Sequence, residues 1–493
     1  MTTDDNTNNT LEIEEKPKIY VPEAEDISET LIRERKFITP IEPSPEAKPD
    51  VYMFESHVEV DKSIGTSTLS GFYRKLGSEL NEMVLRTYKR RWNEMKRLAE
   101  SEYEGMNPED EEAKRIYAVI KKINFYLNLG STQNQRNEAI NLIRLKTLID
   151  PELLNVGRYI PFKNGYLNLK TMNLEEPKGY FTYMLNARYI EGIQSLDQMP
   201  MYKRFLETTF QSEFIPLIND YMGYTFLSKE FPAQIVLFFV GLERMGKGAL
   251  LRLRGLISDK DMSTLRFDKL MMPDNRFVFQ KVMGVNLLFD PETKRDYNYK
   301  MDFHNFNTLF GGDTIEEERK FKEPKSKPNP KAKGIFLANL PLFRVENEAF
   351  LARIRIAVTN TERHSIIPDI EKKIFEAEGD MIASFWANRL HALMEKDFEF
   401  PQTEERARDL WERLTSSVDA WLSEVLMDDY QGIDPGELRD IAYNSYISWC
   451  NEHGIVPLKP KAFSNVMGKM YHMKRRRLAG ELTPYFEGLH IDH

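Results

Sequence analysis

Residues 234–257 read QIVLFFVGLERMGKGALLRLRGLI, and this stretch decides the fold. It opens with a continuous apolar run between Pro232 and Gly241, which is typical of a strand buried on both faces of a parallel sheet. The run after the glycines has a helical pattern. Between them stands GxxxxGK, which in a strand–loop–helix setting aims backbone N–H groups and a lysine at phosphate oxygens. The residues predicted to hold a nucleotide are Gly241, Gly246, Lys247, Gly248 and Ala249.

The position after the lysine departs from this motif. It normally carries Ser or Thr, whose hydroxyl binds Mg²⁺. Here Gly248 and Ala249 follow Lys247. Mg²⁺ would then be held by water and a downstream acid, and slow hydrolysis is an open alternative. A bare GxxxxGK also occurs in ordinary turns, but the strand before it and the helix after it favour a nucleotide site.

Three more buried-strand patterns follow, at 285–289, 334–339 and 354–358, and they alternate with helical stretches. This alternation predicts an α/β fold. The first run ends in Asp290-Pro291-Glu292, where ligands bind in open α/β sheets. Asp290 is the candidate Mg²⁺ ligand and Glu292 would polarise the attacking water. A plain strand-end turn is the alternative.

Two further groups complete the candidate catalytic set. Asn339 ends the 334–339 strand and would hydrogen-bond the γ-phosphate or the lytic water, although Asn before a turn is commonplace. Arg353 and Arg355 flank Ile354 at the start of the last strand. Because alternate positions on a strand share a face, both guanidinium groups can point at a neighbouring subunit's nucleotide. Surface arginines on a sheet edge are the alternative.

The charge is unevenly distributed. The chain carries a net charge of -9, but residues 1–50 contain 13 acidic and 6 basic residues. Arg319–Lys333 has seven basic residues and one acid, and Lys459–Arg477 has seven basic residues and no acid. Such fields attract phosphate even on an acidic chain. Solvated charged loops are the alternative for either cluster.

The motifs resemble, in order and spacing, those of a superfamily 3 helicase. The segment FNTLFGGDTIEEERKFKEP (306–324) resembles one in the viral, phage and plasmid primase–helicase family. Ile160–Tyr189 resembles that family's helical-hairpin domain, although the sequence around Asn164-Gly165 also suggests a β-hairpin. The stretch YNSYISWCNEHGIVPLKPKAFSNVMGKM (443–470) resembles its C-terminal winged helix. The first 150 residues carry no primase signature.

The resemblance implies an ATP- and Mg²⁺-dependent ring, usually a hexamer, that translocates on DNA during replication of a mobile element. It implies that a hairpin from about Glu318 to Lys333 lines the channel and contacts single-stranded DNA, while the winged helix binds duplex. Other replication proteins are also expected as partners. The candidate DNA-binding residues are Lys320, Lys322, Lys325, Lys327, Lys331, Lys333, Lys459, Lys461, Lys474, Arg475, Arg476 and Arg477.

We therefore expect a P-loop, AAA+-type ATPase core with a helical N-terminal region and a C-terminal winged-helix domain. The expected parts are an acidic disordered tail (1–65), a helical region (66–149), an accessory domain (150–230), the ATPase core (231–370), a helical connector (371–412) and the winged helix (413–493).

The expected function is that of an ATP-dependent, ring-forming DNA helicase and replication initiator of a virus, phage, plasmid or integrated island. The runner-up is an origin-recognition or loading factor that binds nucleotide but scarcely hydrolyses it. Gly248 favours the runner-up, whereas the acids, Asn339 and the arginines favour the enzyme. A small-molecule kinase would leave both basic clusters unexplained.

The composition excludes several other classes. No apolar run approaches the ~20 residues of a membrane helix, and the start, MTTDDNTNNT, does not resemble a signal peptide. A single cysteine, Cys450, excludes an internal disulfide and a cysteine zinc site. The expected location is the cytoplasm, or the host cytoplasm if a virus or phage encodes the chain.

Overall fold

The structure is a computed structural model. It describes residues 18–41, 49–61, 66–241, 243–273, 275, 277–293, 300–317, 325–339, 342–343, 345–360, 367–415, 417–426, 436–452, 457–478 and 481–491. The chain forms two compact units. The first takes residues up to Glu55 together with Phe72–Leu154, and the second takes Ser56–Gly71 together with Asn155–His493.

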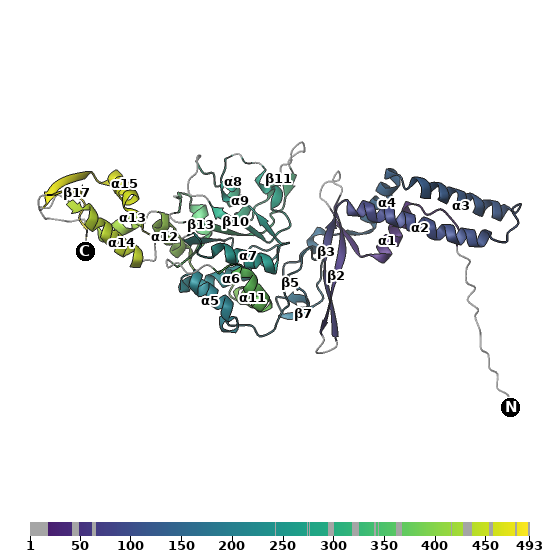
Figure 1. The fold of residues 1–493 in the computed structure, drawn as a ribbon, viewed down its shortest axis with the longest axis horizontal. Helices are drawn as coiled ribbons and strands as arrows, with labels where there is room; N and C mark the ends of the chain where they lie inside the picture. The colour runs from purple at the N-terminus through teal and green to yellow at the C-terminus, as the bar shows by residue number, and fades with distance from the viewer. Residues whose placement is uncertain are drawn as a thin grey trace, which may run out of the picture. The chain divides into compact units, whose positions relative to one another are not determined.

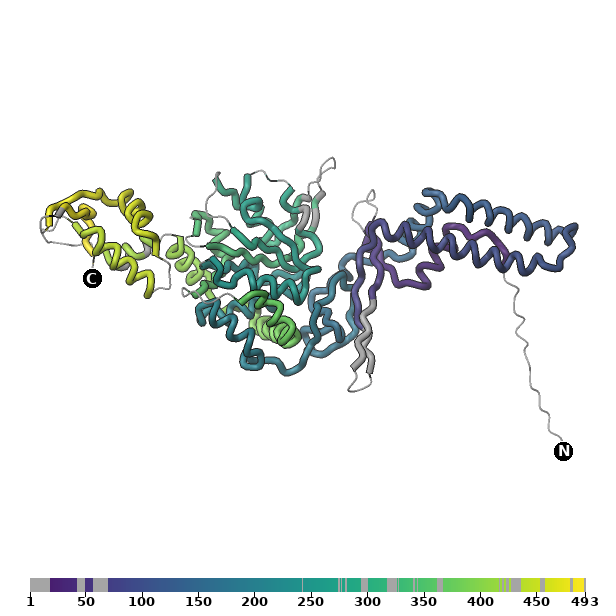
Figure 2. The backbone as a smooth tube through the Cα atoms, in the orientation of Figure 1, coloured from purple at the N-terminus to yellow at the C-terminus, as the bar shows by residue number. Residues whose placement is uncertain are grey.

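The first unit is a helical layer beside a small sheet (Figures 1 and 2). Helix α1 packs on α2 and α4, and α2 packs along α3 and α4. The sheet has the order β3-β2-β1-β4, and β2 and β3 run on into the second unit. The elements are α1 (Ala24–Glu34), β1 (Phe37–Pro40), β2 (Val51–Asp61), β3 (Thr66–Leu76), α2 (Glu79–Tyr103), α3 (Glu111–Leu129), α4 (Gln133–Lys146) and β4 (Leu148–Ile149).

The expectation of a disordered tail over residues 1–65 is wrong for Ala24–Glu34, Phe37–Pro40 and Val51–Asp61. Residues 1–17 lie outside the described part of the chain, but α1, β1 and β2 are ordered elements of the segment that was expected to be disordered. Ile27 and Leu31 of α1 are buried with Trp92 of α2, whose indole N–H donates to the Pro22 carbonyl at 3.1 Å. The polar composition hid this because the apolar partners come from helices 60 or more residues away.

The second unit opens with an antiparallel sheet, β5 (Tyr159–Phe162), β6 (Gly165–Asn168) and β7 (Asn173–Glu175), in that order. Phe162 pairs with Gly165 across a tight turn, so the predicted β-hairpin at Asn164-Gly165 is confirmed. The helical hairpin expected over Ile160–Tyr189 is wrong, because this segment holds strands and loops. The helices lie earlier, in α2 to α4, and strand β3 replaces the expected helix over Thr66–Leu76.

The centre of the second unit is a five-stranded sheet in the order β14-β8-β13-β10-β9, with every pair parallel. Four of its strands coincide with the four predicted apolar runs, so the α/β fold is confirmed. The fifth, β9, is short and was not predicted. The strands are β8 (Val236–Gly241), β9 (Met262–Thr264), β10 (Leu287–Thr293), β13 (Lys333–Asn339) and β14 (Ile354–Val358).

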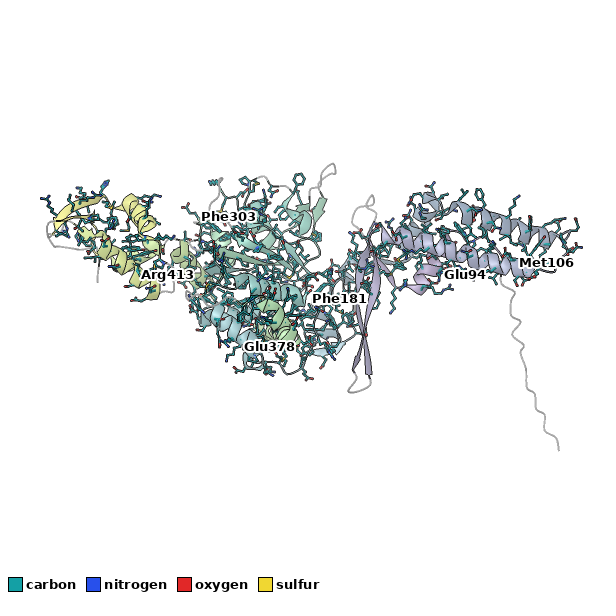
Figure 3. The ribbon with its side chains drawn as sticks, viewed as in Figure 1. Glu94, Met106, Phe181, Phe303, Glu378 and Arg413 are labelled. Carbon is teal, nitrogen blue, oxygen red and sulfur yellow. The ribbon has the colours of Figure 1, made fainter. Side chains whose placement is uncertain are left out.

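Helices cover both faces of this sheet, with α6, α7 and α11 on one side and α8 and α9 on the other (Figure 1). Helix α11 packs on α5, α6 and α7, so it belongs to the core rather than to a connector. Its Glu378, labelled in Figure 3, accepts the backbone N–H groups of Met201 and Tyr202 at the start of α5. The helices are α5 (Pro200–Thr209), α6 (Ile215–Tyr224), α7 (Lys247–Ile257), α8 (Phe267–Leu270), α9 (His304–Gly311), α10 (Glu348–Arg353), α11 (Ile370–Glu395) and α12 (Glu404–Thr415).

The C-terminal segment combines helices with a three-stranded antiparallel sheet in the order β15-β17-β16. Strands β16 and β17 form an antiparallel hairpin near the end of the chain. Trp421, Tyr446 and Phe463 form the aromatic centre of this segment. The elements are α13 (Ser417–Val425), β15 (Gly436–Leu438), α14 (Arg439–Glu452), α15 (Pro460–Met470), β16 (Met473–Leu478) and β17 (Glu481–Glu487).

Candidate functional site

Lys247 lies at the carboxyl edge of the parallel sheet, where β8 and β13 end side by side. The register pairs Asn339 of β13 with Gly241 of β8. The Lys247 ammonium donates to the Gly241 carbonyl at 2.8 Å and to Asn339 Oδ1 at 2.9 Å. The lysine side chain is only 6% exposed. Lys247 and Asn339, two of the predicted catalytic residues, are therefore in direct contact, and Lys247 also contacts the backbone of the predicted loop.

Both glycines of GxxxxGK are required by the backbone and by their neighbours. Gly241 has φ 152°, and a Cβ there would lie 1.9 Å from Thr359 Oγ1. Gly246 has φ 99°, and a Cβ there would lie 2.8 Å from Thr209 Oγ1. These positive φ values and close approaches exclude larger residues. The loop thus packs against two threonines that sequence reasoning missed.

The first turn of α7 offers no hydroxyl at the expected place. Gly248 faces the Arg252 guanidinium, which would lie 3.2 Å from an added Cβ, and Ala249 is buried. Arg252 is itself paired with Glu371 of α11 at 2.7 Å. Gly241 therefore ends β8 and Lys247 begins α7, and neither Gly248 nor Ala249 brings the customary Mg²⁺-binding oxygen.

Asp290 lies on β10, which is separated from β8 by β13. Its carboxylate accepts the backbone N–H of Phe267 at 2.8 Å and that of Glu292 at 3.1 Å. Burial raises the pKa of the Asp290 carboxyl, while the two N–H bonds act in the opposite direction. Glu292 itself is exposed.

The fit to Mg²⁺ rests on the donor set. Within the described residues no group of three or more His, Cys, Asp or Glu side chains is placed to hold a metal. Mg²⁺ needs fewer, because it keeps several waters and takes one or two carboxylates plus substrate phosphates. A carboxylate has about four acceptor sites, and each Asp290 oxygen uses one in the bonds described above. Asp290 therefore suits the role of a single protein ligand to Mg²⁺.

The two arginines lie where the parallel strands begin, whereas Lys247 lies where they end. Arg353 is the last residue of α10 rather than a strand residue, and it donates to the Ala349 carbonyl at 2.7 Å. Arg355 is in β14 and donates to the Ile354 carbonyl at 2.7 Å, and burial lowers the pKa of its guanidinium. The expectation that both share one strand face is wrong. Within one chain neither guanidinium reaches the Lys247 end of its own sheet, since Ile354 pairs with Val236 at the start of β8.

The lysine-rich segment begins as a β-hairpin. Strands β11 (Ile315–Glu317) and β12 (Lys325–Lys327) pair antiparallel, with Glu317 opposite Lys325. Lys320 and Lys322 lie outside the described residues, and for Lys325 and Lys327 only the backbone is described. The Lys331 ammonium donates to the Gly312 carbonyl at 2.8 Å. A hairpin is therefore present, and it starts three residues earlier than expected.

The prediction that Lys333 contacts DNA is wrong, because its side chain is 0% exposed. Its ammonium donates to the carbonyls of Leu227, Glu230 and Lys331 and lies 4.9 Å from the Tyr224 ring. Burial lowers the pKa of the Lys333 ammonium to about 7. Lys333 therefore anchors the start of β13.

A second anchor, Asn329, was not predicted. The Asn329 side-chain amide donates to the carbonyls of Thr308, Leu309 and Asp313, at the end of α9. It thereby fixes the base of the hairpin to that helix.

The basic residues of the C-terminal segment are mostly exposed. Lys459 and Lys461 lie at the start of α15, and Arg475 and Arg477 are alternate residues of β16. Lys474 is paired with Glu487 at 2.6 Å, and Arg476 lies over the Tyr485 ring at 5.4 Å. The exposed cations are thus on α15 and β16, as the sequence predicts.

The comparisons with known proteins concern part of the chain. The family model described as D5 N terminal like matches residues 78–211. This segment runs from the start of α2 to two residues past α5, and it includes the β5–β7 sheet. The match fits the phage primase–helicase family that the motifs resemble, and with it a replication-associated protein. No curated protein matches the chain.

Two similar solved structures are apo forms of the NrS-1 C terminal region, each 11% identical in sequence. One match covers 64% of this chain and 82% of that chain with a TM-score of 0.33. The other covers 64% and 81% with a TM-score of 0.32. Among the described residues, no helix has the length and apolar character needed to cross a membrane.

Proposed function

We propose that this chain is an ATP-dependent, ring-forming DNA helicase that initiates replication of a mobile genetic element. The observation that carries the proposal is the contact of Lys247 with the Gly241 carbonyl and the Asn339 amide at the ends of two parallel strands. Ligands of open α/β sheets bind at this edge, and a lysine beginning a helix after a glycine loop suits polyphosphate.

The proposed mechanism starts with an exchange of partners at Lys247. Nucleotide phosphates would draw the ammonium away from two neutral oxygens, since charge-assisted hydrogen bonds are the stronger ones. Asn339 is then released to orient the γ-phosphate or the attacking water, and the exposed Glu292 polarises that water. Asp290 would be the residue that holds Mg²⁺, whose chemistry there would be to neutralise negative charge during phosphoryl transfer.

The positions of the two arginines support the proposal of a ring. Arg353 and Arg355 lie where the strands of the sheet begin, whereas Lys247 lies where they end. Their guanidinium groups therefore suit the nucleotide of an adjacent copy better than that of their own chain. A guanidinium supplied in this way stabilises charge during phosphoryl transfer. We propose a hexamer, with the β11–β12 hairpin contacting single-stranded DNA.

The C-terminal segment is proposed to be a winged helix that binds duplex DNA. The exposed cations on α15 and β16 support this, because salt-sensitive contacts to phosphates dominate DNA affinity. The proposed location is the cytoplasm of the cell that carries the element.

The decisive experiment measures ATP hydrolysis by the purified chain with and without single-stranded DNA. We expect DNA to stimulate turnover and Lys247→Ala to reduce it to background. Lys260→Ala is the matched control. Lys260 is exposed, and its ion pair with Asp259 is weak, with 4.0 Å between the ammonium nitrogen and the carboxylate oxygen. If wild-type turnover stays at background with DNA present, the chain is not a motor.

The arrangement of subunits is tested by mixing two inactive variants. Lys247→Ala keeps its arginines and Arg353→Ala keeps its lysine, so mixed rings contain some complete sites. We expect the mixture to regain part of the activity that neither variant has alone. Absence of recovery, in a mixture whose particle mass proves co-assembly, contradicts a site shared between subunits.

A second candidate function is a loading factor that binds nucleotide to assemble but scarcely hydrolyses it. Two observations favour it: Gly248 lacks the hydroxyl, and both Asp290 oxygens already accept backbone N–H groups. This candidate predicts ATP-dependent assembly on DNA without turnover. Particle mass with and without ATP and single-stranded DNA, measured beside hydrolysis, separates the two functions.

A further inference from the structure

Thr359 lies directly beside the glycine that opens the loop. It follows β14, and its backbone N–H donates to the Val240 carbonyl of β8 at 2.8 Å. Since Val358 pairs with Val240, the next residues, Thr359 and Gly241, are neighbours at the carboxyl edge of the sheet. Gly241 is in turn paired with Asn339 on its other side. Thr359, Gly241 and Asn339 therefore form one row across three strands.

The Thr359 hydroxyl is buried and lacks a hydrogen-bond partner among the described residues, with the side chain 2% exposed. Buried side-chain hydroxyls in native proteins are nearly always bonded, because an unmade bond carries the full cost of removing the group from water. The hydroxyl also fills the space that a Cβ on Gly241 would need, 1.9 Å away. The folded protein without nucleotide therefore bears the free-energy cost of an unbonded hydroxyl held against the loop.

This hydroxyl lies beside the part of the loop that Lys247 contacts. Lys247 bonds the carbonyl of Gly241, so the hydroxyl and the ammonium approach the same residue of the loop. Position 248, where a Ser or Thr hydroxyl normally binds Mg²⁺, is glycine, so the first turn of α7 brings no hydroxyl to the nucleotide. A nucleotide that displaces the Lys247 ammonium from Gly241 brings phosphate oxygens next to Thr359.

We propose that the hydroxyl of Thr359, the residue after β14, donates a hydrogen bond to a phosphate oxygen of the bound nucleotide. This assignment rests on the proposed nucleotide binding at Lys247. No bond is broken or formed besides the hydrogen bond. An acceptor that carries negative charge makes this bond stronger than one to a neutral oxygen.

The assignment predicts effects of opposite sign in the free and bound protein. Thr359→Val keeps the shape and replaces the unbonded hydroxyl by a methyl group, so the free protein should melt at the same temperature or higher. The affinity for ADP should fall about ten-fold, because a hydrogen bond to a charged group is lost. A residue with a merely structural role would lower melting temperature and affinity together.

The experiment measures ADP binding to the full chain by calorimetry, with Mg²⁺ and with a chelator, beside thermal unfolding without nucleotide. Lys247→Ala should abolish binding. Thr359→Ser, which keeps the hydroxyl, should bind within about two-fold of wild type and so controls for the loss of the methyl group.

The outcomes separate this inference from the function on which it rests. If wild type does not bind ADP, both are overturned. If wild type binds and Thr359→Val binds equally well, only the role of Thr359 is overturned. A loss confined to the Mg²⁺ arm also overturns it, because the hydroxyl would then serve the metal's shell rather than a phosphate. Equal losses of affinity in both arms, with a melting temperature that is unchanged or higher and with rescue by serine, support it.

Discussion

Asp261→Ala should be among the most destabilising single changes in the second unit. Asp261 pairs with Arg254 of α7, and both side chains are 0% exposed. Their closest contact, Nη2 to Oδ2, is 2.8 Å, and Nη1 lies 3.3 Å from Oδ1. The same carboxylate also accepts the Ser258 hydroxyl at 2.8 Å and the Asn286 amide at 3.2 Å. Alanine therefore removes the acceptor of four bonds at once.

The expected cost is about 3 to 5 kcal/mol, the range measured when one partner of a buried pair is removed and the other charge remains. Arg254 keeps its bonds to Thr225 and to the Ser258 carbonyl, so part of its guanidinium stays satisfied. Asp259→Ala, two residues away in an exposed and weak pair, should change stability by no more than about 0.5 kcal/mol.

Urea denaturation of the full chain, followed by far-ultraviolet circular dichroism, measures both variants at a common m-value. A loss below about 1 kcal/mol for Asp261→Ala would refute the reasoning, because it would mean that water reaches the pair. The double change Arg254→Met with Asp261→Leu should recover much of the loss, since apolar replacement of a whole buried pair is often neutral.

Three other predictions follow from single contacts. Gly241→Ala should cost at least about 2 kcal/mol and abolish ADP binding, because the Cβ has no room at φ 152°; melting curves and calorimetry measure both. For Lys333, whose pKa falls from 10.5 to about 7 on folding, the unfolded chain binds more protons between those pH values. Stability should therefore rise with pH in that window by up to about 1.4 kcal/mol per unit, and urea titrations of Lys333→Met should lack this slope. Arg475→Ala and Arg477→Ala should each weaken duplex binding and lower the salt slope by about 1, whereas Lys474→Ala, already ion-paired, should change it less in a fluorescence titration.

The sheet was predictable because its strands carry their own signal. Runs such as QIVLFFV are apolar without alternation, and only a strand covered on both faces by helices tolerates that. The three residues of β9 carry no such pattern, and their place beside β10 comes from pairing with a strand more than 20 residues away. The positions of Lys247 and Asn339 followed from the strands, because the ends of parallel neighbours meet at one edge.

The errors came from side chains whose partners are distant in the chain. Lys333 continues a basic run, and no local pattern reveals the carbonyls of Leu227 and Glu230, which precede it by more than 100 residues. Arg353 was assigned to a strand that begins one residue later, an ordinary uncertainty of element ends. Thr359 could have been suspected, since it follows an apolar strand in the same way as Asn339 does.

Strand β13 has one end at the proposed chemistry and the other beneath the basic hairpin. Asn339 touches the Lys247 ammonium, and Lys333, six residues earlier, is locked by backbone carbonyls at the hairpin's base. A strand hydrogen-bonded on both edges does not stretch, and six residues span about 20 Å. If the proposed function holds, a displacement of Asn339 on nucleotide binding would therefore be passed along β13 to Lys333 at the base of the hairpin.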